Sequence, residues 1–103
     1  DRCVVAALGL LEQRSGALSL ERLADRIGYS ARQLERRFVR HAGYTPKQYA
    51  RVARFRATLR ALADAETGAS LAADLGYADQ SHLIHEFRAF TGTTPSAWRA
   101  GRR

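Results

Sequence analysis

Residues 71–98 read LAADLGYADQSHLIHEFRAFTGTTPSAW, and the earlier stretch 23–49 reads LADRIGYSARQLERRFVRHAGYTPKQY. The two stretches match in order. Their Gly-Tyr pairs lie 48 residues apart, whereas the Thr-Pro pairs that follow lie 49 residues apart, so one extra residue has entered the second copy. Because the matches keep their order over about 27 positions, we interpret the chain as an internal duplication of one small fold.

The residues that both copies share are those that shape helices and turns. Leu34 and Phe38 are four residues apart, which places them on one apolar face of a helix. Leu83 and Phe87 repeat this spacing in the second copy. Glycines that follow apolar helical patterns suit the left-handed position after a helix C-terminus. They are Gly28, Gly43, Gly76 and Gly92.

Capping residues set the expected helix starts. Ser30 and Gln33 have the spacing of a capping box, which predicts a helix beginning at Ala31. The Thr-Pro pairs at 45–46 and 94–95 place an N-cap side chain before a proline in the first helical turn. No segment shows sustained alternation of apolar and polar residues, so we expect an all-α fold of about seven helices. The predicted helices cover about residues 3–14, 20–27, 31–42, 46–64, 68–75, 80–91 and 95–100.

This order predicts two helix-turn-helix subdomains, residues 1–45 and 65–103, joined by a linker helix at 46–64. A basic second helix after a short Gly-containing turn is typical of a reader that places this helix in the DNA major groove. The linker helix would span about 27 Å at about 1.5 Å per residue. That length is compatible with two readers in successive major-groove segments, about 34 Å apart.

The charge distribution points to a polyanionic partner. The chain has 103 residues, a formal net charge of +7 and a pI near 10.7. Residues 30–60 hold nine Lys or Arg against Glu35 alone, which gives +8 in this stretch. Such a stretch favours nucleic acid or an anionic membrane surface, although a solvated helix surface gives the same pattern. The alternative function is therefore a basic helical adaptor that binds protein or an anionic membrane.

Several other classes are disfavoured by composition. Cys3 is the single cysteine, so an internal disulfide is excluded, and we expect this residue to be a small buried hydrophobe in a cytoplasmic protein. No apolar run approaches the about 20 residues that span a bilayer. No nucleophile triad or phosphate-cradling loop is evident, so we expect neither an enzyme nor a cofactor. The absence of Met leads us to interpret the sequence as a piece of a longer chain.

A metal site is a further alternative, carried by three potential ligands on adjacent turns. His82, His85 and Glu86 form an H-x-x-H-E arrangement, which is not the H-E-x-x-H order of metalloproteases. No fourth ligand is apparent, and His85 and Glu86 point in different directions on a helix. We therefore expect no metal.

The two stretches and the segment between them resemble the AraC/XylS-type transcription regulators. The second copy, residues 71–99, is similar to the signature of that family nearly throughout, and residues 50–62 resemble its connecting helix. The resemblance covers about residues 3–100. It implies a bilobal DNA-binding domain that is usually C-terminal to an effector-sensing or dimerising domain. Leu83, Trp98, His85 and Glu86 depart from the residues that are usual in the family at these positions.

The partners that follow are double-stranded operator or promoter DNA, RNA polymerase and an N-terminal effector or dimerisation domain, with no membrane partner. On the first reader helix, Arg32 and Arg36 lie opposite the apolar face, and we predict that they read bases, because Arg binds guanine O6 and N7 in bidentate fashion. Glu35 could accept from cytosine N4 or pair with an arginine of its own helix. Flanking candidates for phosphate contacts are Gln33, Arg37 and Arg40.

On the second reader helix the outward positions differ from those of the first, as expected if each copy reads a different sequence. Gln80 lies at the entering end of the helix and resembles the base or phosphate contact of the family there. His82 lies between the apolar and outward faces, which predicts either packing or a phosphate contact. The remaining predicted DNA contacts are Ser81, His85 and Arg88.

Overall fold

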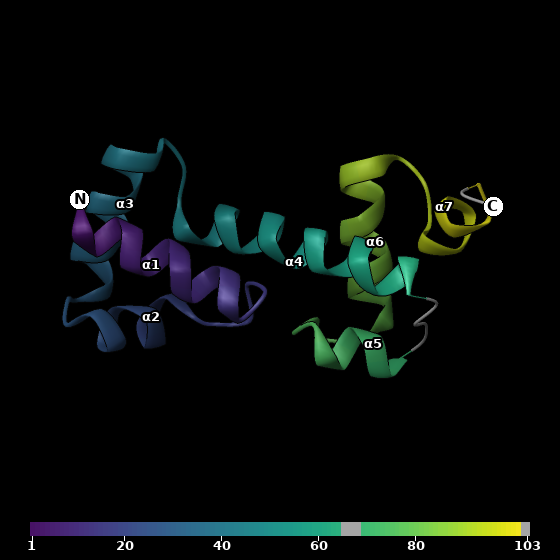
Figure 1. Cartoon of the computed structure of the whole chain (residues 1–103), viewed down its shortest axis with the longest axis horizontal. Helices are drawn as coiled ribbons and strands as arrows, with labels where there is room; N and C mark the ends of the chain where they lie inside the picture. The colour runs from purple at the N-terminus through teal and green to yellow at the C-terminus, as the bar shows by residue number, and fades with distance from the viewer. Residues whose placement is uncertain (65–68, 102–103) are drawn as a thin grey trace. The chain divides into compact units, whose positions relative to one another are not determined.

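The computed structural model describes residues 1–64 and 69–101, which fold into seven α-helices (Figure 1). The described part is therefore all-α, as the sequence predicts. The helices are α1 (Arg2–Gln13), α2 (Leu20–Ile27), α3 (Ala31–Ala42), α4 (Pro46–Ala63), α5 (Ala69–Asp74), α6 (Gln80–Thr91) and α7 (Pro95–Gly101). Each predicted helix is present within one residue at either end, and the predicted start of the fifth, at residue 68, lies outside the described residues.

The predicted caps are confirmed. Ser30 Oγ accepts from the Gln33 amide at 3.1 Å, and Gln33 Oε1 accepts from the Ser30 amide at 3.0 Å, which completes the capping box of α3. Thr45 forms a second capping box with Gln48 at the start of α4. Thr94 Oγ1 accepts from the Ala97 amide at 3.1 Å at the start of α7. The four glycines predicted to be left-handed have φ between 78° and 89°.

The chain divides into two compact units, Asp1–Ala53 and Arg54–Arg103, and the boundary falls within α4. In the first unit α3 packs against both α1 and α2. The core of this unit is built on side chains with no exposed surface, among them Leu11, Leu23, Leu34 and Phe38. Their burial holds the helix-turn-helix pair α2–α3 against α1, so the opposite side of α3 is left in solvent.

In the second unit α6 packs against α5 and α7. Leu83 and Phe87 of α6 join Leu62 of α4 and Leu71 of α5 in the core, all at 5% exposure or less. The pair α5–α6 is thus the second helix-turn-helix, and its apolar side is the one predicted from the duplication. Among the described helices, none is both long and apolar enough to cross a membrane.

Candidate nucleic-acid interface

The outward side of α3 carries the first set of predicted DNA contacts. Leu34 and Phe38 are fully buried, whereas Arg32, Arg36 and Arg40 are exposed. An open depression in the surface of this helix is lined by Glu35, Arg36, Val39 and Arg40. Three arginines of one helix therefore lie on its solvent side, where they are free to approach a phosphate or a base edge.

The outward side of α6 is built at the same helical positions. Its open depression is lined by Ser81, Ile84, His85, Arg88 and Ala89. Moving the lining residues of α3 forward by 49 residues, the offset of the repeat at these helices, gives four of these five residues. Both copies therefore turn equivalent positions to solvent, and the residue types differ between them.

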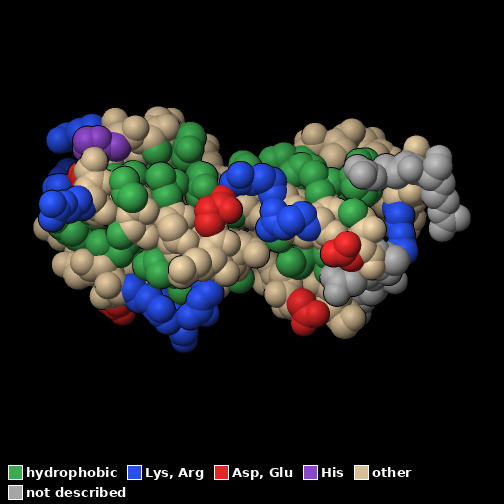
Figure 2. All heavy atoms as spheres, in the orientation of Figure 1, with side chains coloured by type: hydrophobic (Ala, Val, Ile, Leu, Met, Phe, Trp, Pro, Cys, Tyr) green, Lys and Arg blue, Asp and Glu red, His purple; other side chains and the backbone are tan. Residues whose placement is uncertain are grey.

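Two of the flanking candidates on α3 already have partners within the first unit. Arg37 binds the Asp1 carboxylate through Nη2 at 3.1 Å, and its guanidinium lies 5.2 Å from the centre of the Tyr29 ring. His41 Nε2 lies 3.2 Å from the same carboxylate. Gln33 uses its side-chain oxygen in the capping box. On the face shown in Figure 2, basic side chains form separate clusters with hydrophobic and uncharged surface between them.

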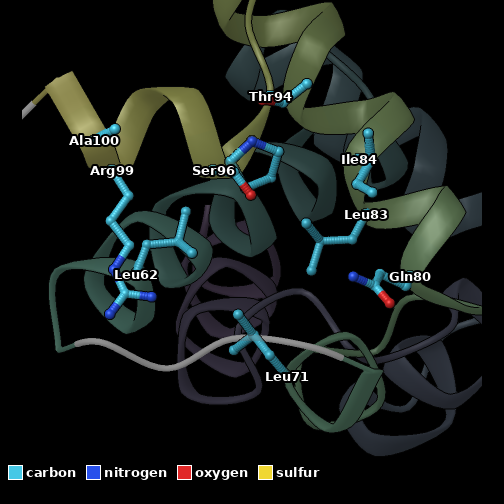
Figure 3. A pocket seen from close by; sticks show the side chains of 10 residues that line it. Leu62, Leu71, Gln80, Leu83, Ile84, Thr94, Ser96, Arg99 and Ala100 are labelled. Atoms are coloured by element: carbon cyan, nitrogen blue, oxygen red, sulfur yellow. The ribbon is translucent and has the colours of Figure 1, made fainter.

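Gln80 is exposed at the first residue of α6 and also lines a cavity of about 570 Å³ within the second unit. The cavity walls are mainly apolar, with leucines from α4, α5 and α6. Figure 3 shows Gln80 and Arg99 on opposite sides of this space, with Leu62, Leu71 and Leu83 between them. Gln80 can therefore reach solvent at the end of the reader helix while its stem covers apolar surface.

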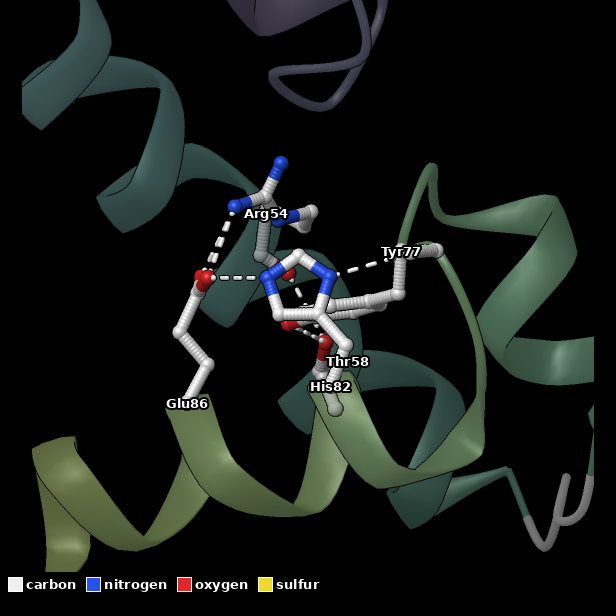
Figure 4. Close-up of polar contacts among 6 residues, drawn as sticks. Arg54, Thr58, Tyr77, His82 and Glu86 are labelled. Carbon is white, nitrogen blue, oxygen red and sulfur yellow. Dashed lines mark hydrogen bonds and ion pairs between the residues drawn. The ribbon is translucent and has the colours of Figure 1, made fainter.

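His82 is placed differently from its neighbours on α6, because both ring nitrogens are bonded within the unit (Figure 4). Nδ1 accepts from the Ala78 amide at 3.0 Å, and Nε2 lies 3.0 Å from Glu86 Oε2. A ring nitrogen that accepts an N–H carries no proton, so the neutral ring donates from Nε2 to the carboxylate. The pattern of the sequence left packing and phosphate contact open for His82, and this geometry favours packing.

Glu86 is buried at 5% exposure, and both of its carboxylate oxygens accept from Arg54 Nη2 at 2.9 Å. Arg54 comes from α4, and its guanidinium lies 4.8 Å from the centre of the Tyr77 ring. The Tyr77 hydroxyl lies 2.9 Å from Thr58 Oγ1. Burial raises the pKa of the Tyr77 phenol, and the hydrogen bond with Thr58 partly opposes that rise.

Sequence reasoning missed the contact between Arg54 and Glu86, which are 32 residues apart. The one local signal was the spacing of His82 and Glu86, four residues apart on a helix. Glu86 points into the unit whereas His85 is exposed. Within residues 1–64 and 69–101 there is no group of three or more side chains suited to hold a metal ion.

Comparison with known proteins identifies the fold and the family. A family model described as "Helix-turn-helix domain" matches residues 23–101. The HTH-type transcriptional activator RhaS of Escherichia fergusonii is 37% identical over 89 residues, which cover 84% of this chain and 31% of RhaS. The chain spans less than a third of the length of the curated relatives that it matches.

Two solved structures agree with this match. An AraC-type DNA-binding domain-containing regulator from Chromobacterium violaceum has a TM-score of 0.85 and 26% identity, with 98% of this chain and 92% of that chain covered. The DNA-binding domain of the global transcriptional factor AdpA, solved in complex with a target DNA, has a TM-score of 0.85 and 27% identity, with 97% and 92% covered. Because the family model matches most of its residues and these structures share its fold, the chain belongs to the AraC-type helix-turn-helix DNA-binding domains of transcription regulators.

Proposed function

We propose that this chain binds double-stranded DNA sequence-specifically, with α3 and α6 as reader helices in the major groove. The observation that carries the proposal is the shared geometry of the two helices. Each buries its Leu and Phe at the same repeat positions and turns the same opposite positions to solvent. A buried and fixed inner side gives each outward side chain a defined place, which base reading requires.

The roles of the outward residues follow from their chemistry. Arg32 and Arg36 are proposed to read bases, and Arg40 to contact phosphate. Arg37 is proposed to contact phosphate, for which it would have to exchange its bond with Asp1. On α6 the proposed contacts are Gln80, Ser81, His85 and Arg88. An adaptor function is not favoured, because the matched family consists of DNA-binding domains.

Replacing Arg36 with Ala should weaken binding to the specific site by about 1–3 kcal/mol and relax the preference at one base pair. The loss is expected because one bidentate base contact is removed while the helix stays folded. The measurement is competition binding against duplexes that differ at single positions. Arg2→Ala removes the same charge from an exposed position of α1 and serves as the control. Equal weakening on every duplex would show that Arg36 contacts phosphate instead.

Affinity for any duplex should fall steeply as salt is raised, because Lys and Arg release counterions from the phosphates that they neutralise. For about six phosphate contacts the loss is about a thousandfold between 50 and 200 mM salt. The slope of log affinity against log salt, from fluorescence anisotropy titrations, gives the number of contacts. A flat slope would favour a partner other than nucleic acid.

The experiment that tests the function as a whole is selection of bound sequences from random duplex DNA. Two preferred blocks about one helical turn apart are expected if both helices read bases. One block would assign specificity to a single unit, and the absence of any block would refute sequence-specific binding.

We further propose a cytoplasmic regulator in which this domain works with an N-terminal effector or dimerisation domain and contacts RNA polymerase at the promoter.

A further inference from the structure

Three side chains of the second unit link the linker helix α4, the turn before α6 and α6 itself. Arg54 of α4 binds Glu86 of α6, Glu86 binds His82, and His82 holds the amide of Ala78 in the turn (Figure 4). We refer to Arg54, Glu86 and His82 as the Arg54–Glu86–His82 network. Its last bond is to Ala78, the residue directly before Asp79, and Asp79 is the N-cap of α6. The network therefore ends where the reader helix begins.

The first copy has a related contact with the charges exchanged. Arg37 occupies the repeat position of Glu86, 49 residues earlier, and binds Asp1 at the start of α1. Gln33 occupies the position of His82, and it also accepts a backbone N–H from the turn before its helix. Each reader helix is thus tied to its turn by the third helical residue and to an earlier helix by an ion pair. Similar bonds recur although the residue types differ, which supports a structural role for these bonds at the start of each reader helix.

Stability alone is a poor account of the ion pair in the second unit. Glu86 and Arg54 have only 6% and 13% of their side-chain surface exposed, so both groups lose most of their hydration. Arg54 Nε is buried and finds no hydrogen-bond partner among the described residues. Apolar residues of similar size often fill such a position at no loss of stability. What an apolar pair cannot supply is the directional bond to His82.

We infer that Arg54, Glu86 and His82 are positioning residues that fix the first turn of α6, and thereby set the base preference of the second unit without touching DNA. The inference rests on the proposed DNA-binding function. Gln80 and Ser81 are the first two residues of that turn, and His85 follows one turn later. A displacement of about 1 Å at such residues is enough to spoil a directional contact.

The test is the double variant Arg54→Met/Glu86→Leu, which leaves the net charge unchanged and replaces the ion pair with apolar side chains of similar size. We expect it to fold with a melting temperature close to that of the parent. Discrimination against base changes in the second block should fall roughly tenfold, the worth of about one base contact. Discrimination in the first block and the salt slope should stay as they are. Leu71→Ala, which removes core volume outside the network, is the destabilised control.

Two outcomes of the DNA experiments would overturn the inference. In the first, the double variant keeps its discrimination against base changes in the second block. In the second, Leu71→Ala loses as much of that discrimination as the double variant does, at a temperature where both variants are folded. A DNA-free measurement keeps the inference separate from the proposed function. Nitrogen NMR should show the parent His82 ring protonated at Nε2, and the Ala78 amide should exchange faster in the double variant. A ring protonated at Nδ1, or equal exchange, would overturn the inference whatever the DNA experiments show.

Discussion

Gly16→Ala is expected to lower the free energy of unfolding of the first unit by about 2–5 kcal/mol. Gly16 is buried with φ +78°, a left-handed conformation that costs a residue with a Cβ about 1–2 kcal/mol. The added Cβ would also lie against the carbonyl oxygen of Ala50 in α4, and 2.9 Å from its carbonyl carbon. Because backbone atoms of a helix cannot yield cheaply, overpacking adds about 1–3 kcal/mol.

Two other glycines separate these contributions. Gly28 has φ +89° with open space around the new Cβ, so Gly28→Ala should show the conformational cost of about 1–2 kcal/mol alone. Gly9 lies within α1, also with open space, and Gly9→Ala should stabilise by up to about 1 kcal/mol. Urea unfolding followed by circular dichroism gives all three values. If Gly16→Ala costs no more than Gly28→Ala, the close packing of α4 on this turn is refuted.

The helices were predictable because each is specified by residues close in sequence. Ser30 and Gln33 mark the start of α3 by a bond that spans three residues, and the apolar spacing of Leu34 and Phe38 marks its inner side. Local signals of this kind need no knowledge of the rest of the fold. The duplication added an independent check, since α6 had to repeat the pattern of α3.

The two unpredicted contacts with the largest consequences join residues that are distant in the sequence. No residue near Gly16 in the sequence predicts that the backbone of α4 packs against it. The Ser15-Gly16 pair alone indicates only a turn. The sequence marks Glu86 only as a departure from the residue usual in the family, and the reason for a carboxylate there becomes clear when the packing of α4 on α6 brings Arg54 beside it. The outward positions of the reader helices were predictable from periodicity, but which bases they meet depends on groups outside this chain.

Phe38→Ala and Phe87→Ala are expected to impair different parts of DNA binding, because each destabilises a different unit. Each ring is at most 1% exposed, and removing it should lower the stability of its unit by about 3–5 kcal/mol through lost burial and a residual cavity. Marginal stability of about 5–15 kcal/mol makes this a large fraction of the total. Phe38 supports the helix that carries Arg32 and Arg36, within the stretch that holds the excess positive charge.

Loss of order in the first unit should therefore reduce both overall affinity and the salt slope, because the arginines of α3 are then no longer held together in the positions from which they would contact phosphates. Phe87→Ala should instead erase the preference in the second block while most of the salt-dependent affinity remains. Phe90→Ala removes the same ring from a position that is 40% exposed and should cost less than half as much stability. Thermal melts and titrations at two salt concentrations give these quantities. Equal losses of affinity and salt slope in the Phe38 and Phe87 variants would mean that destabilising either unit impairs binding by both. The prediction that the more basic first unit supplies most of the salt-dependent affinity would then be wrong.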